Sequence, residues 1–220
     1  MKTKLLSIAM MVALILAAIT RGQAQEYDGP CLPPTHGLDD HQSAFCGSTV
    51  TQTIALSAGV NWFSTYVDIT LDDLKDALVD ALGTSATITV KSRTASVKCQ
   101  RGRWAGNLTS LNLAEMYKID VTTDCEISLE GMPIDPTILT LTISEGANYM
   151  AFPYSQSMPV ANLFGTFPAN LDQVKSKTQN TKYNHGRWTG SLNTLEPGKG
   201  YIYVSEDAND RAFTFPTNSK

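Results

Sequence analysis

The sequence predicts a β-rich α+β fold made of two tandem homologous modules, each a small, mainly antiparallel sheet with one short helix. Three observations lead to this prediction. The stretch GRWAGNLTSLNLAEMY at residues 102–117 recurs as GRWTGSLNTLEPGKGY at residues 186–201. Segments that alternate apolar and polar residues, typical of half-buried strands, dominate both copies. One segment in each copy changes to helical spacing.

Within the repeated stretch the two copies are 84 positions apart, so Gly102 recurs at Gly186. The identical pairs are Gly102/Gly186, Arg103/Arg187, Trp104/Trp188, Gly106/Gly190, Leu108/Leu192, Leu111/Leu195 and Tyr117/Tyr201. Upstream, Gly59-Val60-Asn61-Trp62 answers Gly146-Ala147-Asn148-Tyr149 with a slip of three residues. Each copy is large enough for a small domain. We therefore predict a first module at residues 51–134 and a second at residues 135–220.

The chain begins with the pattern of a secretory signal peptide. Lys2 and Lys4 precede an apolar run at residues 5–19, and Gly22-Gln23-Ala24 is a small-residue cleavage site. The run is shorter than the roughly 20 residues that a membrane span needs. We predict cleavage after Ala24, export to the periplasm, cell surface or medium, and no membrane insertion afterwards.

Charge and composition limit the classes of binding partner that are possible. Removal of Lys2, Lys4 and Arg21 with residues 1–24 changes the formal net charge from −4 to −7. This acidic balance argues against nucleic acid or an anionic membrane as partner. The apolar content of 42% is too high for a disordered chain.

Residues 25–50 form the predicted N-terminal arm, which has several prolines and glycines and no apolar periodicity. Cys31, His36, His41 and Cys46 fall five residues apart in it, a spacing that also admits a zinc site. That spacing is not one of a standard zinc finger, and an oxidising compartment favours a disulfide. We predict that Cys31 pairs with Cys46 and that no metal is bound.

The other two cysteines bracket the repeated stretch of the first module. At the offset of 84, Cys99 falls on Tyr183 and Cys125 falls on Asn209, so the second module lacks both. Their joint absence predicts a second disulfide, Cys99 with Cys125.

In the first module, residues 53–66 read as a strand, a turn at Ala58-Gly59 and a second strand. Thr70–Gly83 reads as a helix, with Thr70 and Asp73 as a capping box and Gly83 as its stop. Further strands are expected within residues 87–100, at 117–121 and at 126–129, with Trp104 on a turn between them.

The second module is expected to repeat these elements. Its helix, within residues 157–167, contains Pro159 and Gly165 and should be shorter. The expected strands are residues 139–143, 149–152, 173–183, 201–204 and 212–215. Residues 132–136, with two prolines, are the expected stiff joint between the modules.

Catalytic signatures are missing from the sequence. It has no G-x-S-x-G elbow and no H-E-x-x-H helix, and its histidines are His36, His41 and His185. A histidine-dependent triad would have to draw on the arm or on the one position near Trp188. We predict no enzyme activity, no catalytic residues and no cofactor.

The repeat resembles a family of secreted repeat modules in surface and exported proteins of gut-type Gram-negative bacteria. Their hallmark is a G-W-N-W opening and a W-x-G-x-L-x-x-L-x-P-G-x-G-Y close. The close at Trp188 to Tyr201 matches fully, and the one at Trp104 to Tyr117 lacks the Pro-Gly-x-Gly. The resemblance implies a non-catalytic module on a secreted or cell-surface protein.

Aromatic residues are the candidate binding residues. Trp62, Trp104, Trp188 and Tyr149 could stack on sugar rings if their faces were exposed. A tryptophan repeated beside leucines is more often part of a core. The sequence therefore predicts a surface or adhesion-type interaction protein with a protein or glycan partner, and carbohydrate binding by exposed aromatics is the alternative.

Overall fold

The structure is a computed structural model of the chain and describes residues 48–217. The predicted signal peptide, most of the arm and the predicted Cys31–Cys46 disulfide lie outside the described residues, as do His36 and His41. Within this range no helix combines the length and apolar character needed to cross a membrane.

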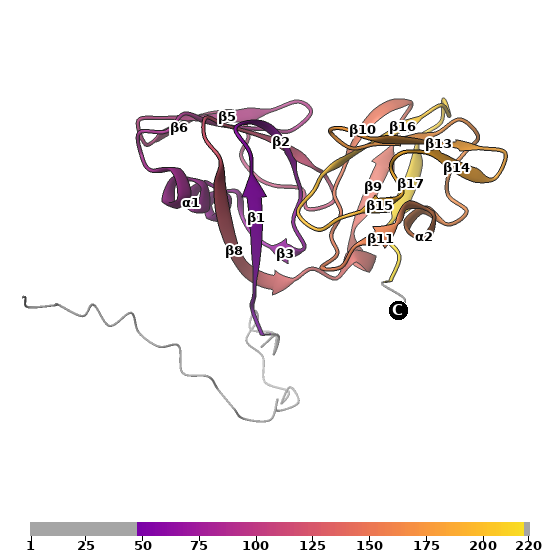
Figure 1. Cartoon of the computed structure of the whole chain (residues 1–220), viewed down its shortest axis with the longest axis horizontal. Helices are drawn as coiled ribbons and strands as arrows, with labels where there is room; N and C mark the ends of the chain where they lie inside the picture. The colour runs from indigo at the N-terminus through magenta and orange to yellow at the C-terminus, as the bar shows by residue number, and fades with distance from the viewer. Residues whose placement is uncertain (1–47, 218–220) are drawn as a thin grey trace, which may run out of the picture. The chain divides into compact units, whose positions relative to one another are not determined.

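The described chain is β-rich α+β, as predicted, and its strands pair antiparallel. We call residues 48–134 the first half and residues 135–217 the second half. In the first half, a five-stranded sheet has the order β2-β7-β4-β5-β6; Figure 1 labels its strands β2, β5 and β6. Its strands are β2 (Gly59–Phe63), β4 (Ile88–Lys91), β5 (Ser96–Gln100), β6 (Arg103–Gly106) and β7 (Tyr117–Val121).

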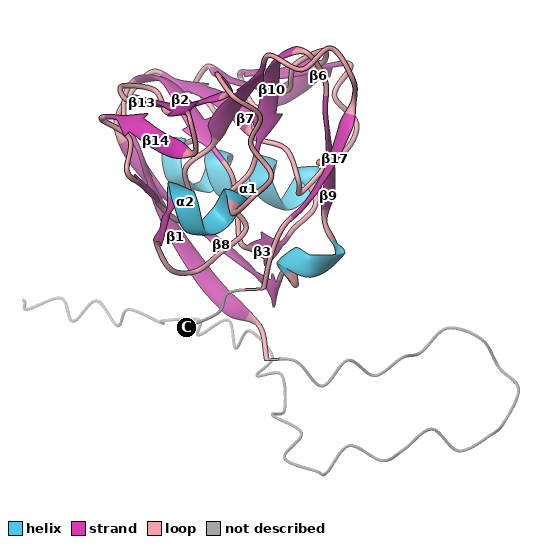
Figure 2. Ribbon diagram, turned by 90° about the vertical axis from the view of Figure 1, so that its right-hand side faces the viewer, coloured by secondary structure: helices cyan, strands magenta, loops and turns pink. Residues whose placement is uncertain are grey.

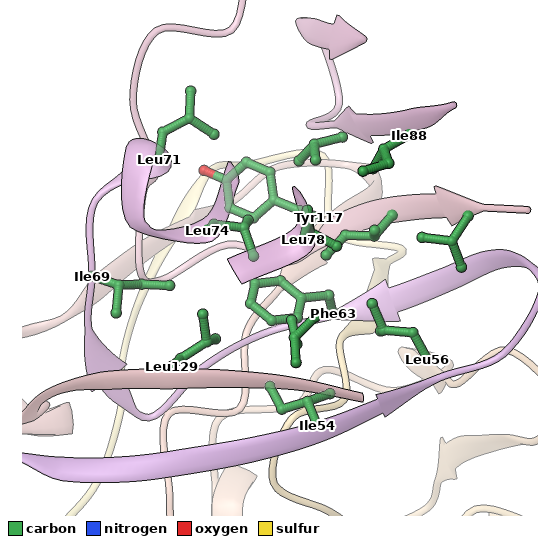
Figure 3. Close-up of a cluster of buried hydrophobic side chains, with 14 of the residues drawn as sticks. Ile54, Leu56, Phe63, Ile69, Leu71, Leu74, Leu78, Ile88, Tyr117 and Leu129 are labelled. Atoms are coloured by element: carbon green, nitrogen blue, oxygen red, sulfur yellow. The ribbon is translucent and has the colours of Figure 1, made fainter. Parts of the chain in front are cut away.

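A second sheet and a helix complete the first half. The sheet has the order β1-β8-β3, with β1 (Val50–Leu56), β3 (Val67–Asp68) and β8 (Cys125–Pro133). Helix α1 (Leu71–Leu82) buries Leu74 and Leu78. Figure 3 shows these two side chains beside Phe63 of β2 and Tyr117 of β7. Helix and sheets thus share one hydrophobic core.

The second half has its own five-stranded sheet, in the order β10-β16-β12-β13-β14. Its strands are β10 (Gly146–Met150), β12 (Gln173–Lys175), β13 (Asn180–Asn184), β14 (Arg187–Gly190) and β16 (Tyr201–Ser205). Two strand pairs accompany it: β9 (Thr140–Ile143) with β17 (Arg211–Thr214), and β11 (Met158–Pro159) with β15 (Thr194–Leu195). The helical segments are η1 (Pro136–Ile138) and α2 (Val160–Phe164); Figure 2 shows the helices in cyan against the magenta strands.

The two five-stranded sheets have the same strand order when each strand is matched to its counterpart in the other half. The matched pairs are β2/β10, β4/β12, β5/β13, β6/β14 and β7/β16. Each half also has a separate cluster of buried apolar side chains, and the cluster of the second half is rich in aromatic residues.

The helix predictions are confirmed. Thr70 accepts a hydrogen bond from the Asp73 N–H, and the Asp73 side chain accepts one from the Thr70 N–H, which is the predicted capping box. The Thr70 hydroxyl and the Thr70 N–H both donate to the Asp73 carboxylate, and these two bonds lower the pKa of Asp73. Helix α2 is short, as expected, and Pro159 at its start provides no side-chain cap.

Two local predictions were wrong. Trp104 does not lie on a turn but within strand β6, opposite Cys99. Residues 173–183 form two strands, β12 and β13, because the chain turns between Lys175 and Asn180. In the segment predicted as the joint, residues 132–136, the first two residues belong to strand β8, and Pro133 lies opposite Val67 of β3.

Candidate functional site

The repeated tryptophans lie on tight hairpins. Arg101 and Gly102 connect β5 to β6, with φ of 52° and 73°. His185 and Gly186 connect β13 to β14, with φ of 48° and 82°. Two residues with positive φ define the type I′ turn that suits the twist of a hairpin. The glycine of each signature therefore has a conformational role, and His185 is an exposed turn residue.

The next signature glycine permits a close approach between backbones. A Cβ on Gly106 would lie 2.1 Å from the carbonyl oxygen of Ser96, and one on Gly190 would lie 2.3 Å from that of Asn180. Ser96 and Asn180 are themselves 84 residues apart. Both copies thus need glycine here for packing.

Trp104 and Trp188 are half-buried and pack against the cores of their halves. The Trp188 ring centroid lies 5.6 Å from that of Phe164 and 5.2 Å from that of Tyr183. Trp104 lies opposite Cys99, at the place that Tyr183 has relative to Trp188. Both tryptophans of the signature therefore contribute to packing, and Trp188 also lines a cleft of about 460 Å³ with Tyr183 and Arg187.

The signature tyrosines hold the loops that precede them. The Tyr117 hydroxyl accepts a hydrogen bond from the Asn112 N–H at 2.6 Å, and the Tyr201 hydroxyl accepts one from the Glu196 N–H at 2.7 Å. Burial raises the pKa of Tyr201 to about 12. These hydroxyls are structural hydrogen-bond partners.

The opening motif, Gly-x-Asn followed by an aromatic residue at residues 59–62 and 146–149, also has a structural role. The Asn61 side chain donates to the carbonyl oxygens of Ser57 and Gly59 and accepts from the Ser57 N–H. Asn148 makes the same bonds to Ser144 and Gly146. The asparagine of the motif therefore ties the turn that leads into β2 or β10.

Contacts between the halves occur in reciprocal pairs. The Ser64 N–H donates to Gly198 O at 3.3 Å, and the Ala151 N–H donates to Ala114 O at 3.0 Å. Ser64 corresponds to Ala151, and Ala114 corresponds to Gly198, at the offsets of 87 and 84 found above. Such an exchange of roles is the mark of a two-fold interface. The halves thus meet with approximate two-fold symmetry.

The glycine-rich segment of the second signature forms part of this contact. The Gly200 N–H donates to Trp62 O at 3.0 Å. A Cβ on Gly200 would lie 2.4 Å from the Cβ of Met116, which is its own counterpart 84 residues earlier. The glycine makes room for the methionine, so the two copies of this position differ because they face each other.

Two of the predicted binding residues, Trp62 and Tyr149, belong to different halves and both lie near Lys118. The Lys118 ammonium lies 5.5 Å from the Trp62 ring centroid and 5.1 Å from that of Tyr149. Both rings are half-buried and within range of a cation–π interaction. The structure therefore separates the four predicted residues into a boundary pair and a hairpin pair.

The largest described cleft between the halves has a volume of about 430 Å³ and is here named the β1 cleft. One wall is residues 53–57, with Asn61 and Trp62; the other is residues 176–179 with residues of the 192–201 segment. Lys177 and Lys199 bring positive charge, and Lys199 forms an ion pair with Glu196. Its volume lies within the range of small-ligand sites.

A smaller cleft of about 110 Å³ contains the corresponding residues with the halves exchanged. Arg93 corresponds to Lys177 and Glu115 to Lys199, while Tyr149 takes the place of Trp62. We call it the β9 cleft, because Leu141 and Thr142 of β9 line it. The approximate symmetry therefore produces two related clefts with different linings.

A buried polar cluster lies in the core of the second half. Asp172 and Tyr203 are fully buried, and the Tyr203 hydroxyl and Arg211 Nη2 both donate to Asp172 Oδ2. The N–H groups of Ala169 and Glu206 also donate to this carboxylate. Burial opposes ionisation of Asp172, but these hydrogen bonds outweigh it and lower its pKa. Burial and the bond to Asp172 raise the pKa of Tyr203.

The structure does not contain the predicted Cys99–Cys125 disulfide. Both cysteines in the described range are free thiols. Cys99 lies on β5 opposite Ile88 and Trp104, whereas Cys125 begins β8 in the other sheet, opposite Leu56. Burial raises the pKa of the Cys125 thiol.

The counterpart of Cys125 differs from the predicted one because the repeat offset is not constant. Leu56 of β1 corresponds to Ile143 of β9 at the offset of 87. Ile143 lies opposite Arg211, so the counterpart of Cys125 is Arg211 and not Asn209.

No protein-family model matches the chain, and neither a curated protein nor a solved structure matches it at a significant level.

Apart from Trp62, the residues of the β1 cleft were missed as binding residues by sequence reasoning. Lys177 and Gln179 come from a turn that carries no distinctive pattern, and Lys199 lies in the Pro-Gly-x-Gly of the second signature, which indicates a turn. They become one wall of a cleft only because the halves pack against each other. Among the described residues, no group of three or more His, Cys, Asp or Glu side chains is arranged to hold a metal ion.

Proposed function

We propose that the chain is an exported, non-catalytic interaction protein of the surface or adhesion type, built from two homologous modules. The modules are residues 51–134 and 135–220, after a signal peptide at 1–24 and an arm at 25–50. The shared strand order and the equal bonding of Asn61 and Asn148 support a duplication. The resemblance to secreted repeat modules of Gram-negative bacteria supports the location.

The observation that carries the proposal is the contrast between the repeated scaffold and the unrepeated clefts. The glycines, asparagines and tyrosines of the motifs have the same structural roles in both halves. The cleft positions instead change type, from Trp62 to Tyr149 and from Lys199 to Glu115. A constant framework with varied residues at an accessible boundary is the arrangement expected of a binding protein.

The positions of the titratable groups support a non-catalytic role. The carboxylate with the most hydrogen bonds, Asp172, lies in a core and is paired with Arg211. His185 is exposed at the tip of a hairpin. A protein or a glycan on a cell surface is the proposed partner.

Carbohydrate binding is a second candidate, favoured by one observation. Trp62 lines the β1 cleft together with polar residues such as Thr178 and Gln179. An aromatic ring beside hydroxyl and amide groups is suited to a sugar, whose ring stacks while its hydroxyls form hydrogen bonds. Trp104 and Trp188 are weaker candidates because they pack against the cores.

Expression of the full chain in a Gram-negative host tests the proposal. Mass spectrometry should find cleavage after Ala24, and beads coated with the purified protein should adhere to arrayed surface proteins or glycans. An unprocessed cytosolic product, or beads that bind neither class, would contradict the proposal. Acrylamide quenching of Trp62, compared with the Trp62→Phe variant, separates the candidates: protection by a polysaccharide favours carbohydrate binding.

A further inference from the structure

Strand β1 has one unpaired edge, and the β1 cleft lies along it. All seven residues of β1 pair with β8, and the sheet order β1-β8-β3 places β1 at the margin of its sheet among the described strands. An edge strand presents unpaired N–H and C=O groups that can pair with another extended chain. The exposed backbone edge is thus a potential binding surface.

The lining of the cleft shows which side of β1 it contacts. Side chains of a strand alternate between the two faces of the sheet, so a cleft on one face would be lined by every second residue. The β1 cleft is lined by consecutive residues, Thr53, Ile54, Ala55, Leu56 and Ser57, and by none of β8. The cleft therefore follows the free edge and not a face.

The opposite wall limits what can enter. The turn at residues 176–179 and the segment at 194–200 face the edge from the second half. They hinder a second sheet from approaching, yet the volume of about 430 Å³ leaves room for part of one extended chain. The β9 cleft repeats the relation, since β9 is also an edge strand and its consecutive residues Leu141 and Thr142 line that cleft.

Charge indicates the kind of chain that fits. Lys177 is exposed and forms no ion pair with a described residue, while Lys199 is paired with Glu196. The cleft therefore has an excess positive charge on a chain whose formal net charge is −4. Opposite charge favours encounter and fixes register.

We propose that the β1 cleft binds an acidic, extended peptide segment of a partner protein, which adds as a strand to the free edge of β1. Backbone hydrogen bonds supply affinity in this mode, and pockets for alternate side chains supply specificity. Lys177 pairs with an acidic side chain of the peptide, and Trp62 contacts it at the β2 side of the cleft. The inference deepens the proposed interaction function and rests on it.

A display library of random twelve-residue peptides, selected against the purified full-chain product, tests the proposal. Selected peptides should be rich in acidic and β-branched residues. A synthetic copy should protect from hydrogen exchange those amides of residues 53–56 whose N–H groups face the free edge of β1. The same peptide with N-methyl groups on the residues whose N–H groups would face β1 should not bind, because it cannot complete a strand ladder.

Charge-reversal variants provide the matched control. Lys177→Glu should weaken binding of the selected peptide at least tenfold, whereas Lys98→Glu, on an exposed position of β5 outside both clefts, should leave it unchanged. No selected peptide, equal binding of the N-methylated form, protection outside residues 53–56, or equal effects of the two variants would each overturn strand addition.

Bead adhesion and peptide binding, measured on the same purified protein, distinguish failure of this inference from failure of the proposed function. If the coated beads still adhere to surface proteins when no peptide engages β1, the interaction function stands and uses another surface. If an acidic oligosaccharide binds the cleft and shields Trp62 in place of a peptide, strand addition is overturned and carbohydrate binding is favoured.

Discussion

Three corresponding positions are apolar in the core of the first half and polar in the core of the second half. In the first half Ile88, Ile119 and Cys125 form part of an apolar core. In the second half their counterparts are Asp172, Tyr203 and Arg211, which form one hydrogen-bonded cluster. The same strand arrangement thus accommodates either an apolar set or a polar set in which the Asp172 carboxylate is paired with Arg211 and Tyr203. Because an unpaired buried charge is costly, the three positions must change together.

The largest expected effect comes from breaking the polar set. Asp172→Ala breaks the ion pair with Arg211 and leaves the Tyr203 hydroxyl and two backbone N–H groups without their acceptor, and should lower the free energy of unfolding by about 3–5 kcal/mol. Urea denaturation followed by fluorescence measures this loss.

A triple variant sharpens the comparison. Asp172→Leu with Tyr203→Phe and Arg211→Met makes the cluster apolar, like the first half, and should be more stable than Asp172→Ala alone. If the triple variant is instead the less stable protein, the idea of exchangeable sets fails.

The next effect concerns the glycines that both halves share. Gly106→Ala should destabilise by about 3 kcal/mol because its Cβ would clash with the Ser96 carbonyl. Gly190→Ala should cost less, since Gly106 has a φ of 149° and Gly190 has no positive φ. Gly165→Ala is the control, because a Cβ there meets no atom within 4 Å and its cost is backbone strain alone. Thermal unfolding of the three variants should give this order, and a control as unstable as Gly106→Ala would contradict the steric explanation.

Sequence reasoning succeeded where the determinants are local. Spacing and capping residues predicted α1, since Thr70 and Asp73 act within one helical turn. The repeat predicted which residues matter but not their roles: Gly106 permits a backbone contact, and Asn61 ties a turn. Neither the clefts nor the Asp172 cluster could be predicted, because they depend on packing between segments far apart. The three-residue slip between Leu56 and Ile143 also hid the counterpart of Cys125.

The opening motifs should differ in energy although their bonds are equal. Asn148 is buried and Asn61 is only half-buried, so loss of the side chain leaves more unsatisfied backbone groups away from water in the second half. Asn148→Ala should cost about 2 kcal/mol, and Asn61→Ala about half as much. Urea unfolding midpoints test the order, and the reverse order would rule out burial as its cause.

Acid should destabilise the folded state through the polar cluster, but by less than the Asp172→Ala substitution does. The pKa of Asp172 is lowered in the folded state, so its contribution is present above the unfolded value and is lost as pH falls through the folded value. Protonation keeps the side chain in place, so the loss should be smaller than in Asp172→Ala. Urea unfolding midpoints should be measured from pH 6 to pH 2. The midpoint concentration should decrease most at pH values below about 4, which is close to the pKa of free aspartate. The apolar triple variant should show a shallower fall, and equal slopes would exclude Asp172 as the source.

The smallest expected effect on stability concerns the N-terminal caps of the two helices. Thr70→Ala removes the side-chain acceptor of the Asp73 N–H at the start of α1, and should cost about 1 kcal/mol. Helix α2 has no side-chain cap to lose, and Pro159→Ala should change stability by less, because the helix is held by the burial of Val160, Leu163 and Phe164. Thr70→Ser, which keeps a hydroxyl acceptor, should retain most of the stability. Should Thr70→Ser lose as much as Thr70→Ala, the methyl group and not the cap would be what stabilises the start of α1.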